Sequence, residues 1–344
     1  MISEANISKI LSLLCGLLLA GCFFSPDPSP EIIELRGDVF GSYYIVKYTG
    51  DLRPALAQQK LDDLFLGFNN EFSTYQKDSV ISRFNEAKAK ERIKVSPRFI
   101  EMLSMAQRFH QKTEGAFDPT LGPVIKLWGF GGGKRRDHTP SKKELDEALS
   151  RVGFPLIKWN ETEVWKEKNG VVLDVNAFAP GWVADLVGEI LEANNIKNYM
   201  ADIGGEILFR GEKSPKSSWV AGIEKPSEKH GESVQLAFRI KNLALATSGS
   251  YRQFFTENGK RRSHIIDPRT GMPVDHSISS ASVIADRAGE ADAWGTAMMV
   301  LGEKGIQLAE KNGIKVLLLD AKGVKSFEEI LSPSMRLFLD EHRL

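Results

Sequence analysis

Two side chains near the carboxyl-terminal end of the sequence could bind a metal ion. Asp292 and Thr296 are four residues apart in a stretch that predicts a helix, so they share one face of it. A carboxylate, a hydroxyl and nearby carbonyl oxygens are ligands that suit Mg²⁺. Such an ion can bridge phosphates and neutralise charge as a P–O bond breaks. The alternative, which the residue types alone favour, is an acidic residue that only complements a helix dipole.

His264 is the best acid–base candidate among the six histidines. A neutral imidazole can accept the proton of an attacking hydroxyl. The alternative is a structural histidine at the end of a strand. Asp267 can orient His264 or cap the turn at Pro268–Gly271, and we favour the turn. The other five histidines have no spacing that indicates a metal pair.

One further segment could contact an anionic ligand, and a second only resembles a phosphate-binding loop. Asp174 is expected to end a strand, and the following residues 176–181 turn into a helix, where backbone N–H groups can hold an anion or a ring edge. Helix capping by Asp174 is the alternative. Residues 129–134 are glycine-rich but do not form a P-loop, because Arg135 replaces the required Ser/Thr and a helix precedes them.

The elements that position these residues follow from periodicity and capping signals. Helices are predicted at Pro54–Phe68, from Ser96-Pro97 to just before Gly115, from the capping box Ser141/Glu144, at Gly181–Ala193, and at Ala288–Lys311 with a break near Gly302. Strands are predicted at Glu34–Thr49 as a strand pair or one long bent strand around Gly41, at Ile157–Asp174 as a hairpin turning at Asn169-Gly170, in short pieces over 198–286, and at Ile314–Leu319. Without regular βαβ alternation, the fold class is α+β.

The composition is that of a globular protein. The 344 residues are 42% apolar and 26% charged, which is enough to bury a core. Lys+Arg and Asp+Glu are equal at 45 each, so no basic excess indicates a nucleic-acid partner.

The amino terminus predicts export and anchoring. Residues 10–20 form an apolar run that is too short to span a bilayer but suits a signal peptide. Leu19–Cys22 resembles a bacterial lipobox, and the proline-containing residues after it read as a tether. We expect a signal peptide at 1–21, a tether at 22–33 and one domain at 34–344. Lipidated Cys22 would anchor the protein at the periplasmic face of a bacterial membrane.

Four segments, in this order and at these distances, resemble the ApbE family of FAD:protein FMN transferases. They are Phe72–Tyr75 with Asp78-Ser79 and Arg83–Asn85, Thr113–Thr120, Leu173–Gly181, and Ser263–Gly271 continuing to Ala291–Thr296. The resemblance covers about Arg36 to Leu344, and the stretches HIIDPRTG and EADAWGTAMMVLG are its most specific parts.

The resemblance implies a fold, a reaction and a metal. The fold would be α+β, with mixed sheets and helices enclosing an FAD cleft and two interlocked halves in one compact unit. The reaction would be Mg²⁺-dependent transfer of FMN from FAD to a Ser/Thr hydroxyl of an acceptor protein, with release of AMP. Asp292, Thr296 and the backbone oxygens of Ala177 and Gly295 would bind the metal, with His264 near the pyrophosphate.

The resemblance also implies a set of FAD contacts, namely Phe40, Tyr75, Ala116, Phe117, Asp118, Asp174, Pro180 and Ile266. Phe40 stands where the family usually has Met, and Pro180 where it often has Lys or Glu. Proline has neither charge nor N–H, so any polar contact there is lost. For Phe40 and Tyr75 the alternative is core packing, and for residues 116–118 it is a turn between helices.

The implied partners are FAD and an acceptor protein, which would be a membrane redox subunit of the Nqr/Rnf type or a related periplasmic flavoprotein. Two alternatives to the transferase remain. One is a protein that binds or stores FAD without chemistry. The other is an FAD pyrophosphatase that uses water and releases FMN and AMP.

Overall fold

The computed structural model describes residues 31–130, 139–214, 217–225, 234–249, 254–257, 260–263, 265–321 and 327–344. The predicted signal peptide, Cys22 and most of the tether lie outside these residues, and so does His264. Ile32–Leu344 form one compact unit. No helix in the described part of the chain has the length and apolar character needed to cross a membrane.

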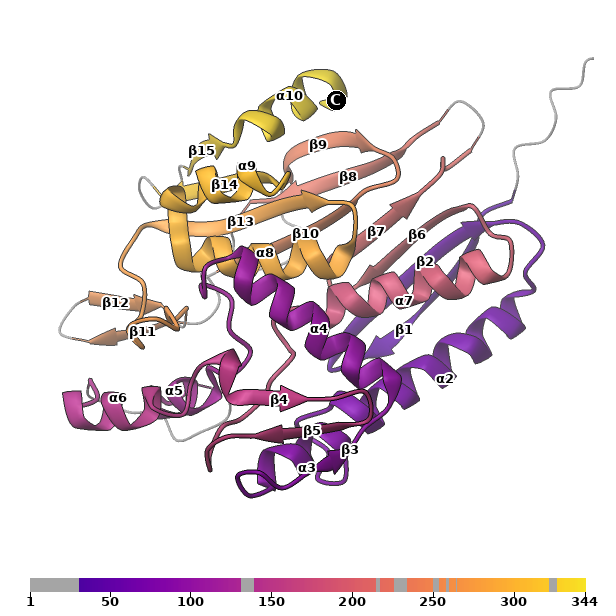
Figure 1. Ribbon diagram of the computed structural model, residues 1–344. Helices are drawn as coiled ribbons and strands as arrows, with labels where there is room; N and C mark the ends of the chain where they lie inside the picture. The colour runs from indigo at the N-terminus through magenta and orange to yellow at the C-terminus, as the bar shows by residue number, and fades with distance from the viewer. Residues whose placement is uncertain are drawn as a thin grey trace, which may run out of the picture. The chain divides into compact units, whose positions relative to one another are not determined.

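An eight-stranded antiparallel sheet forms the centre of this unit (Figure 1). Its strands, in spatial order, are β1 (Ile33–Val39), β2 (Ser42–Thr49), β6 (Asn198–Ile203), β7 (Glu206–Arg210), β10 (Ala244–Gly249), β13 (Ile278–Ala285), β14 (Lys315–Ala321) and β15 (Phe327–Leu331). β1 and β2 are joined at Phe40-Gly41, both with positive φ, so the predicted strand pair around Gly41 is confirmed.

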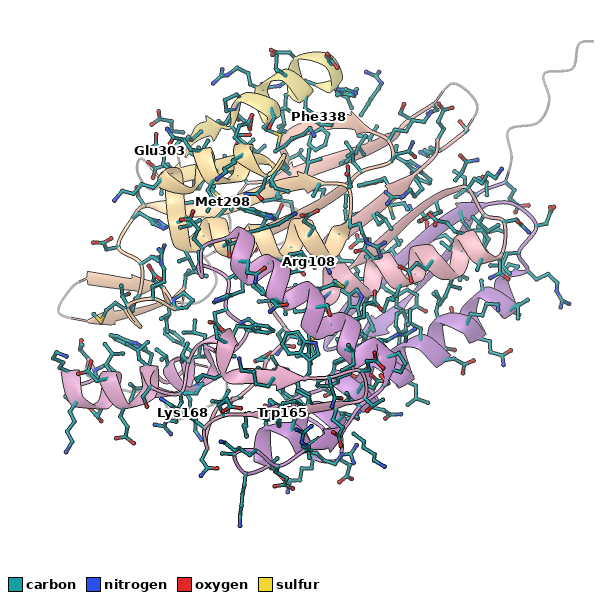
Figure 2. All side chains as sticks on the ribbon, in the orientation of Figure 1. Arg108, Trp165, Lys168, Met298, Glu303 and Phe338 are labelled. Carbon is teal, nitrogen blue, oxygen red and sulfur yellow. The ribbon has the colours of Figure 1, made fainter. Side chains whose placement is uncertain are left out.

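Helices α7 (Ala179–Ala193) and α8 (Ala288–Leu301) pack on one face of the large sheet (Figure 1). The hairpin of β8 (Trp219–Glu224) and β9 (Val234–Ile240) and helix α10 (Pro333–His342) belong to a second apolar cluster. β14 lies between this cluster and the one that includes Met298 of α8. Its side chains alternate between the two: Val316 and Leu318 belong to the cluster of Met298, and Leu317 and Leu319 to that of Phe338 of α10 (Figure 2 labels Met298 and Phe338). A strand buried on both faces explains its continuous apolar sequence.

Most of the remaining elements belong to the amino-terminal half of the chain. The helices are α2 (Pro54–Phe72), α3 (Val80–Glu86), α4 (Pro97–Lys112), α5 (Gly122–Leu127), α6 (Lys142–Leu149), α9 (Ile306–Lys311) and the 3₁₀ turns Phe154–Leu156 and Gly302–Gly305. A small sheet has the order β3 (Ile93–Lys94), β5 (Glu163–Lys166), β4 (Ile157–Trp159), and β11 (Phe254–Glu257) pairs with β12 (Lys260–Ser263).

The capping signals in the sequence act as predicted. Ser96 Oγ accepts the Phe99 N–H at 3.1 Å at the start of α4, and Gly115 follows the end of this helix with φ of 80°. Ser141 and Glu144 form the reciprocal capping box of α6. The predicted break near Gly302 is confirmed, since α8 ends there at a glycine with φ of 60°.

The predicted hairpin turn at Asn169-Gly170 is wrong. The hairpin of β4 and β5 turns at 160–162, where Asn160 Oδ1 accepts the N–H groups of Thr162 and Glu163. Asn169-Gly170 forms a later turn, after the chain has left the small sheet. Residues 171–175 are extended but belong to no strand, so Asp174 does not end one.

Candidate functional site

The predicted metal residues lie where α7 and α8 meet. Asp292 is buried, and its Oδ2 accepts the Gly181 N–H at 3.1 Å. The helices approach so closely that a Cβ on Gly181 would lie 2.3 Å from the Ala288 carbonyl oxygen. Asp185 fixes the start of α8, because its two carboxylate oxygens accept the N–H groups of Ala288 and Gly289 at 2.9 and 3.0 Å.

The other oxygen atoms of the predicted metal set lie one turn further along α8. Thr296 Oγ1 donates to the Ala177 carbonyl oxygen at 3.2 Å, which links α8 to the segment before α7. Gly295 faces Ser248 of β10, whose Oγ would lie 2.9 Å from a Cβ at this position. Asp292 and Thr296 therefore share a helix face, as the sequence predicts, and that face meets Gly181 and Ala177.

The electrostatics at this contact favour added positive charge. Burial and the nearby Glu206 carboxylate raise the pKa of Asp292 well above its ordinary value, and the hydrogen bond from Gly181 only partly opposes them. Burial raises the pKa of Asp202 to about 6, and burial together with Asp202 raises the pKa of Glu206 to about 7. A divalent cation would relieve this repulsion.

The donor set suits a hard cation but is poor in side-chain ligands. Within the described residues no group of three or more His, Cys, Asp or Glu side chains could hold a metal ion. A site here would therefore combine the Asp292 carboxylate and the Thr296 hydroxyl with backbone carbonyls. Oxygen-only sets of this kind fit Mg²⁺, which usually keeps several waters.

A cavity of about 360 Å³ opens beside this contact. It brings together seven of the predicted site residues, from four separate parts of the chain: Ala116, Phe117, Asp118, Asp174, Ala177, Ile266 and Thr296. Its walls are mainly apolar with a few polar groups, and its volume lies in the usual range for small-molecule sites.

The Asp118 carboxylate, in this wall, is held by backbone N–H groups. Its Oδ1 accepts the Thr120 N–H at 2.8 Å, and its Oδ2 accepts the Phe154 N–H at 3.1 Å. His110 Nδ1 lies 3.0 Å from the Phe117 carbonyl oxygen and 3.4 Å from Asp118 Oδ2. The carboxylate thus shapes the turn, the alternative that the sequence left open for residues 116–118.

Asp174 lines the cavity next to this loop, because its N–H donates to the Pro119 carbonyl oxygen at 2.8 Å. Its Oδ1 accepts the Asn176 N–H at 2.9 Å, and burial raises its pKa.

Asp267 caps the turn at Pro268–Gly271, the role that the sequence favoured over orienting His264. Its Oδ1 accepts the Arg269 backbone N–H, and its carboxylate pairs with the Arg269 guanidinium at 2.7 Å. These bonds lower the pKa of Asp267 in spite of its partial burial.

The other predicted contacts do not line this cavity. Phe40 packs on Phe65 and Phe68 of α2, with ring centroids 5.9 and 5.3 Å away. Tyr75 is 89% exposed in the loop after α2, and Pro180 is half-buried in the first turn of α7. An elongated ligand would have to leave the cavity to reach Phe40 or Tyr75.

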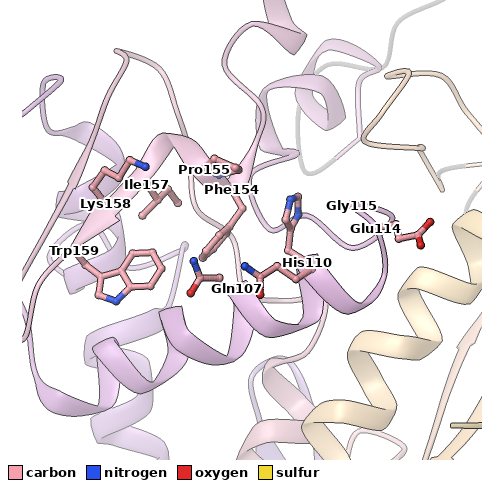
Figure 3. A pocket seen from close by; sticks show the side chains of 10 residues that line it. Gln107, His110, Glu114, Gly115, Phe154, Pro155, Ile157, Lys158 and Trp159 are labelled. Atoms are coloured by element: carbon pink, nitrogen blue, oxygen red, sulfur yellow. The ribbon is translucent and has the colours of Figure 1, made fainter. Parts of the chain in front are cut away.

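A second cavity, of about 490 Å³, is lined by His110 and Gly115 on the α4 side and by Phe154 and Trp159 opposite (Figure 3). None of the residues that line it also lines the first cavity. His110 links the two cavities, because it lines the second one and contacts the backbone of Phe117 in the first.

Sequence reasoning gave no role to Asp185, Lys166 or His110. Asp185 and Lys166 did leave a signal, since each is a charged residue at an apolar position. Asp185 sits within the buried face of α7, and Lys166 follows the inward alternation of Val164 in β5. A buried charge requires nearby partners, so such positions mark structural anchors.

The sequence model of the ApbE family matches residues 40–318. The FAD:protein FMN transferase of Haemophilus influenzae is 37% identical over 323 residues, which cover 91% of this chain and 92% of that protein. The FAD:protein FMN transferase of Vibrio cholerae is 36% identical over 338 residues, which cover 96% of this chain and 99% of that protein.

Solved structures agree. The flavin transferase ApbE from Vibrio cholerae is 35% identical with a TM-score of 0.80, covering 91% of this chain and 100% of that one. The apo form of the Pseudomonas stutzeri flavinyl transferase ApbE is 29% identical with a TM-score of 0.82, and the match covers 90% of this chain and 97% of that one. The predicted α+β fold is thereby confirmed, and the chain belongs to the ApbE family.

Proposed function

We propose that this protein is a FAD:protein FMN transferase, which moves FMN from FAD to a Ser/Thr hydroxyl of an acceptor protein and releases AMP. The observation that carries the proposal is the contact of Thr296 Oγ1 with the Ala177 carbonyl oxygen, where two predicted metal ligands meet and both line the cavity. Membership of the ApbE family, whose relatives carry this enzyme name, supports it.

We propose that Mg²⁺ is held by Asp292, Thr296 and the backbone oxygens of Ala177 and Gly295. The raised pKa of Asp292 supports a cation here, because a carboxylate buried beside Glu206 gains most from added positive charge. When bound, Mg²⁺ would neutralise negative charge on the phosphates as the P–O bond breaks.

The chain's own residues supply binding and proton transfer. The apolar walls around Phe117 and Ile266 would exclude water from the flavin, and Asp174 would contact its polar edge. The acceptor oxygen attacks the FMN phosphorus, and its proton passes to His264. The bond from phosphorus to the bridging oxygen breaks, and AMP leaves with that oxygen. The role of His264 is supported by its neighbours Ile265 and Ile266, which line the cavity.

The decisive test uses the purified protein with FAD, Mg²⁺ and an acceptor fragment that carries a target Ser/Thr. We expect fluorescent flavin to stay on the acceptor in a denaturing gel, and Asp292→Asn to lose at least about a hundredfold in rate. Asparagine keeps an acceptor for the Gly181 N–H, so the Asp292→Asn protein should fold normally. Release of free FMN alone would instead indicate a pyrophosphatase, and unchanged FAD a binding protein. Full activity of Asp292→Asn would remove the metal assignment.

We also propose that the protein is anchored at the periplasmic face of a bacterial membrane through lipidated Cys22, with an Nqr/Rnf-type or related periplasmic flavoprotein as acceptor. The lipobox-like Leu19–Cys22 supports this, because a tethered lipid would hold the enzyme close to membrane substrates. In detergent phase separation the full chain should enter the detergent phase, and Cys22→Ser should stay in the aqueous phase. Equal partitioning of both would exclude the anchor.

A further inference from the structure

Three residues of the cavity wall come from a segment that belongs to no strand or helix. Residues 171–177 contribute Asp174, Asn176 and Ala177 to the cavity, and this segment connects β5 to α7, with a turn at 176–178. We propose that Asn85 and Lys166 are positioning residues that set the register of this segment, and so place Asp174 and Ala177 for FAD. This inference rests on the proposed transferase function.

Asn85, at the end of α3, takes the place of a neighbouring strand. Its Oδ1 accepts the Leu173 N–H at 2.7 Å, and its Nδ2 donates to the Leu173 carbonyl oxygen at 2.9 Å. One side chain therefore satisfies both backbone groups of a fully buried residue, as a strand neighbour would. Because residue 173 is fixed in this way, the next side chain, Asp174, is directed into the cavity.

Lys166 joins the same two parts of the chain. Its Nζ donates to the Asn85 carbonyl oxygen at 2.7 Å and to the Val171 carbonyl oxygen at 2.9 Å. The side chain is buried, with Nζ 5.2 Å from the centroid of the Phe84 ring. An ammonium group buried among carbonyls accepts few other geometries, so it holds α3 and residue 171 together.

The segment is tied to the other walls directly after this clamp. The Asp174 N–H donates to the Pro119 carbonyl oxygen at 2.8 Å, beside the loop of Phe117 and Asp118. The Ala177 carbonyl oxygen accepts from Thr296. A shift of one residue at Leu173 would therefore displace Asp174 and the proposed metal ligand Ala177 together. Neither Asn85 nor Lys166 lines the cavity, so both act through this segment.

The test compares Asn85→Ala and Lys166→Met with Asn194→Ala. Asn194 is a matched control, because its half-buried Nδ2 also donates to a backbone carbonyl, that of Ile190 at 2.7 Å, near the far end of α7. Each variant is measured for thermal stability, FAD affinity, KM for FAD and kcat. We expect Asn85→Ala and Lys166→Met to weaken FAD binding about tenfold or more. Asn194→Ala should stay within about twofold of the wild type at a similar loss of stability.

Hydrogen exchange gives a readout that does not depend on activity. Asn85→Ala should speed exchange of the Leu173 and Asp174 amides, and Asn194→Ala should leave both unchanged. Should Asn85→Ala fail to fold, Asn85→Asp carries the same test, since it keeps the acceptor for Leu173 and loses the donor. Equal FAD affinity and equal exchange in the Asn85 and Asn194 variants would overturn the inference. A wild type that transfers no flavin would refute the proposed function, while exchange still decides whether the clamp exists.

Discussion

The crossing of α7 and α8 can be tested with one methyl group. In Gly181→Ala the new Cβ would lie 2.3 Å from the Ala288 carbonyl oxygen and 2.8 Å from Asp292 Cβ. Neither neighbour is the far end of a flexible side chain, so the helices themselves must separate. The substitution therefore acts on the same contact that holds the Asp292 carboxylate by the Gly181 N–H.

The expected magnitude is a balance of three effects. Because Gly181 lies in the first turn of α7, alanine gains there at most the roughly 1 kcal/mol by which it is favoured over glycine in a helix interior. Overpacking a buried contact costs about 1–3 kcal/mol, and loss of the Gly181–Asp292 hydrogen bond costs about 1 kcal/mol more. Gly181→Ala should therefore lower the free energy of unfolding by roughly 1–3 kcal/mol, and it should also impair flavin transfer because Asp292 moves.

Gly67→Ala is the matched control, because Gly67 is also inside a helix, α2, and a Cβ at this position would have no neighbour within 4 Å. It should raise the free energy of unfolding by about 1 kcal/mol and leave transfer unchanged. Urea unfolding of both variants, with flavin transfer assayed in parallel, gives the comparison. A Gly181→Ala protein as stable and active as Gly67→Ala would refute the close helix contact.

Three further predictions concern charge, capping and exposure. The folded pKa of Asp202, about 6, lies above its unfolded value, so folded protein binds the extra proton between about pH 4 and 6. The free energy of unfolding should fall as pH rises through this window, by up to about 3 kcal/mol. Urea unfolding at pH 4 and pH 8 should show a smaller fall in Asp202→Asn than in the wild type. Asp185→Ala leaves the Ala288 and Gly289 amides unpaired. It should lower the free energy of unfolding by about 3 kcal/mol, which thermal unfolding measures. Tyr75→Ala should change stability by less than about 0.5 kcal/mol, because the side chain is 89% exposed, yet weaken FAD binding in titration calorimetry.

Local chemistry explains which parts of the fold the sequence could predict. The cap at Ser96, the capping box at Ser141 and the shared face of Asp292 and Thr296 each depend on residues a few positions apart. The helical spacing of Asp292 and Thr296 placed both side chains on one face, but only the family resemblance favoured a metal site there over a helix-dipole role. The backbone oxygens of Ala177 and Gly295 came from the resemblance alone, because no local pattern distinguishes one backbone carbonyl from another.

Long-range side-chain bonds explain what the sequence could not predict. The apolar alternation of residues 157–174 fits a hairpin with a late turn as well as an early one, so Asn169-Gly170 was the natural choice. The actual partner of Leu173 is the amide of Asn85, 88 residues earlier in the chain. Such a bond replaces a strand neighbour without any pattern in either segment, and so residues 171–175 looked like a strand.

The position of Asp292 in α8 bears on the two interpretations that the sequence left open for this residue. An acid that serves only the helix dipole should cap the first turn of α8, but Asp185 already binds the Ala288 and Gly289 amides there. Asp292 lies in the second turn and accepts a hydrogen bond from Gly181, while burial and Glu206 oppose its charge. A carboxylate so placed destabilises the fold unless a proton or a cation joins it. The helix dipole of α8 therefore does not account for the position of Asp292, and the proposed Mg²⁺ site would supply the cation that this carboxylate lacks.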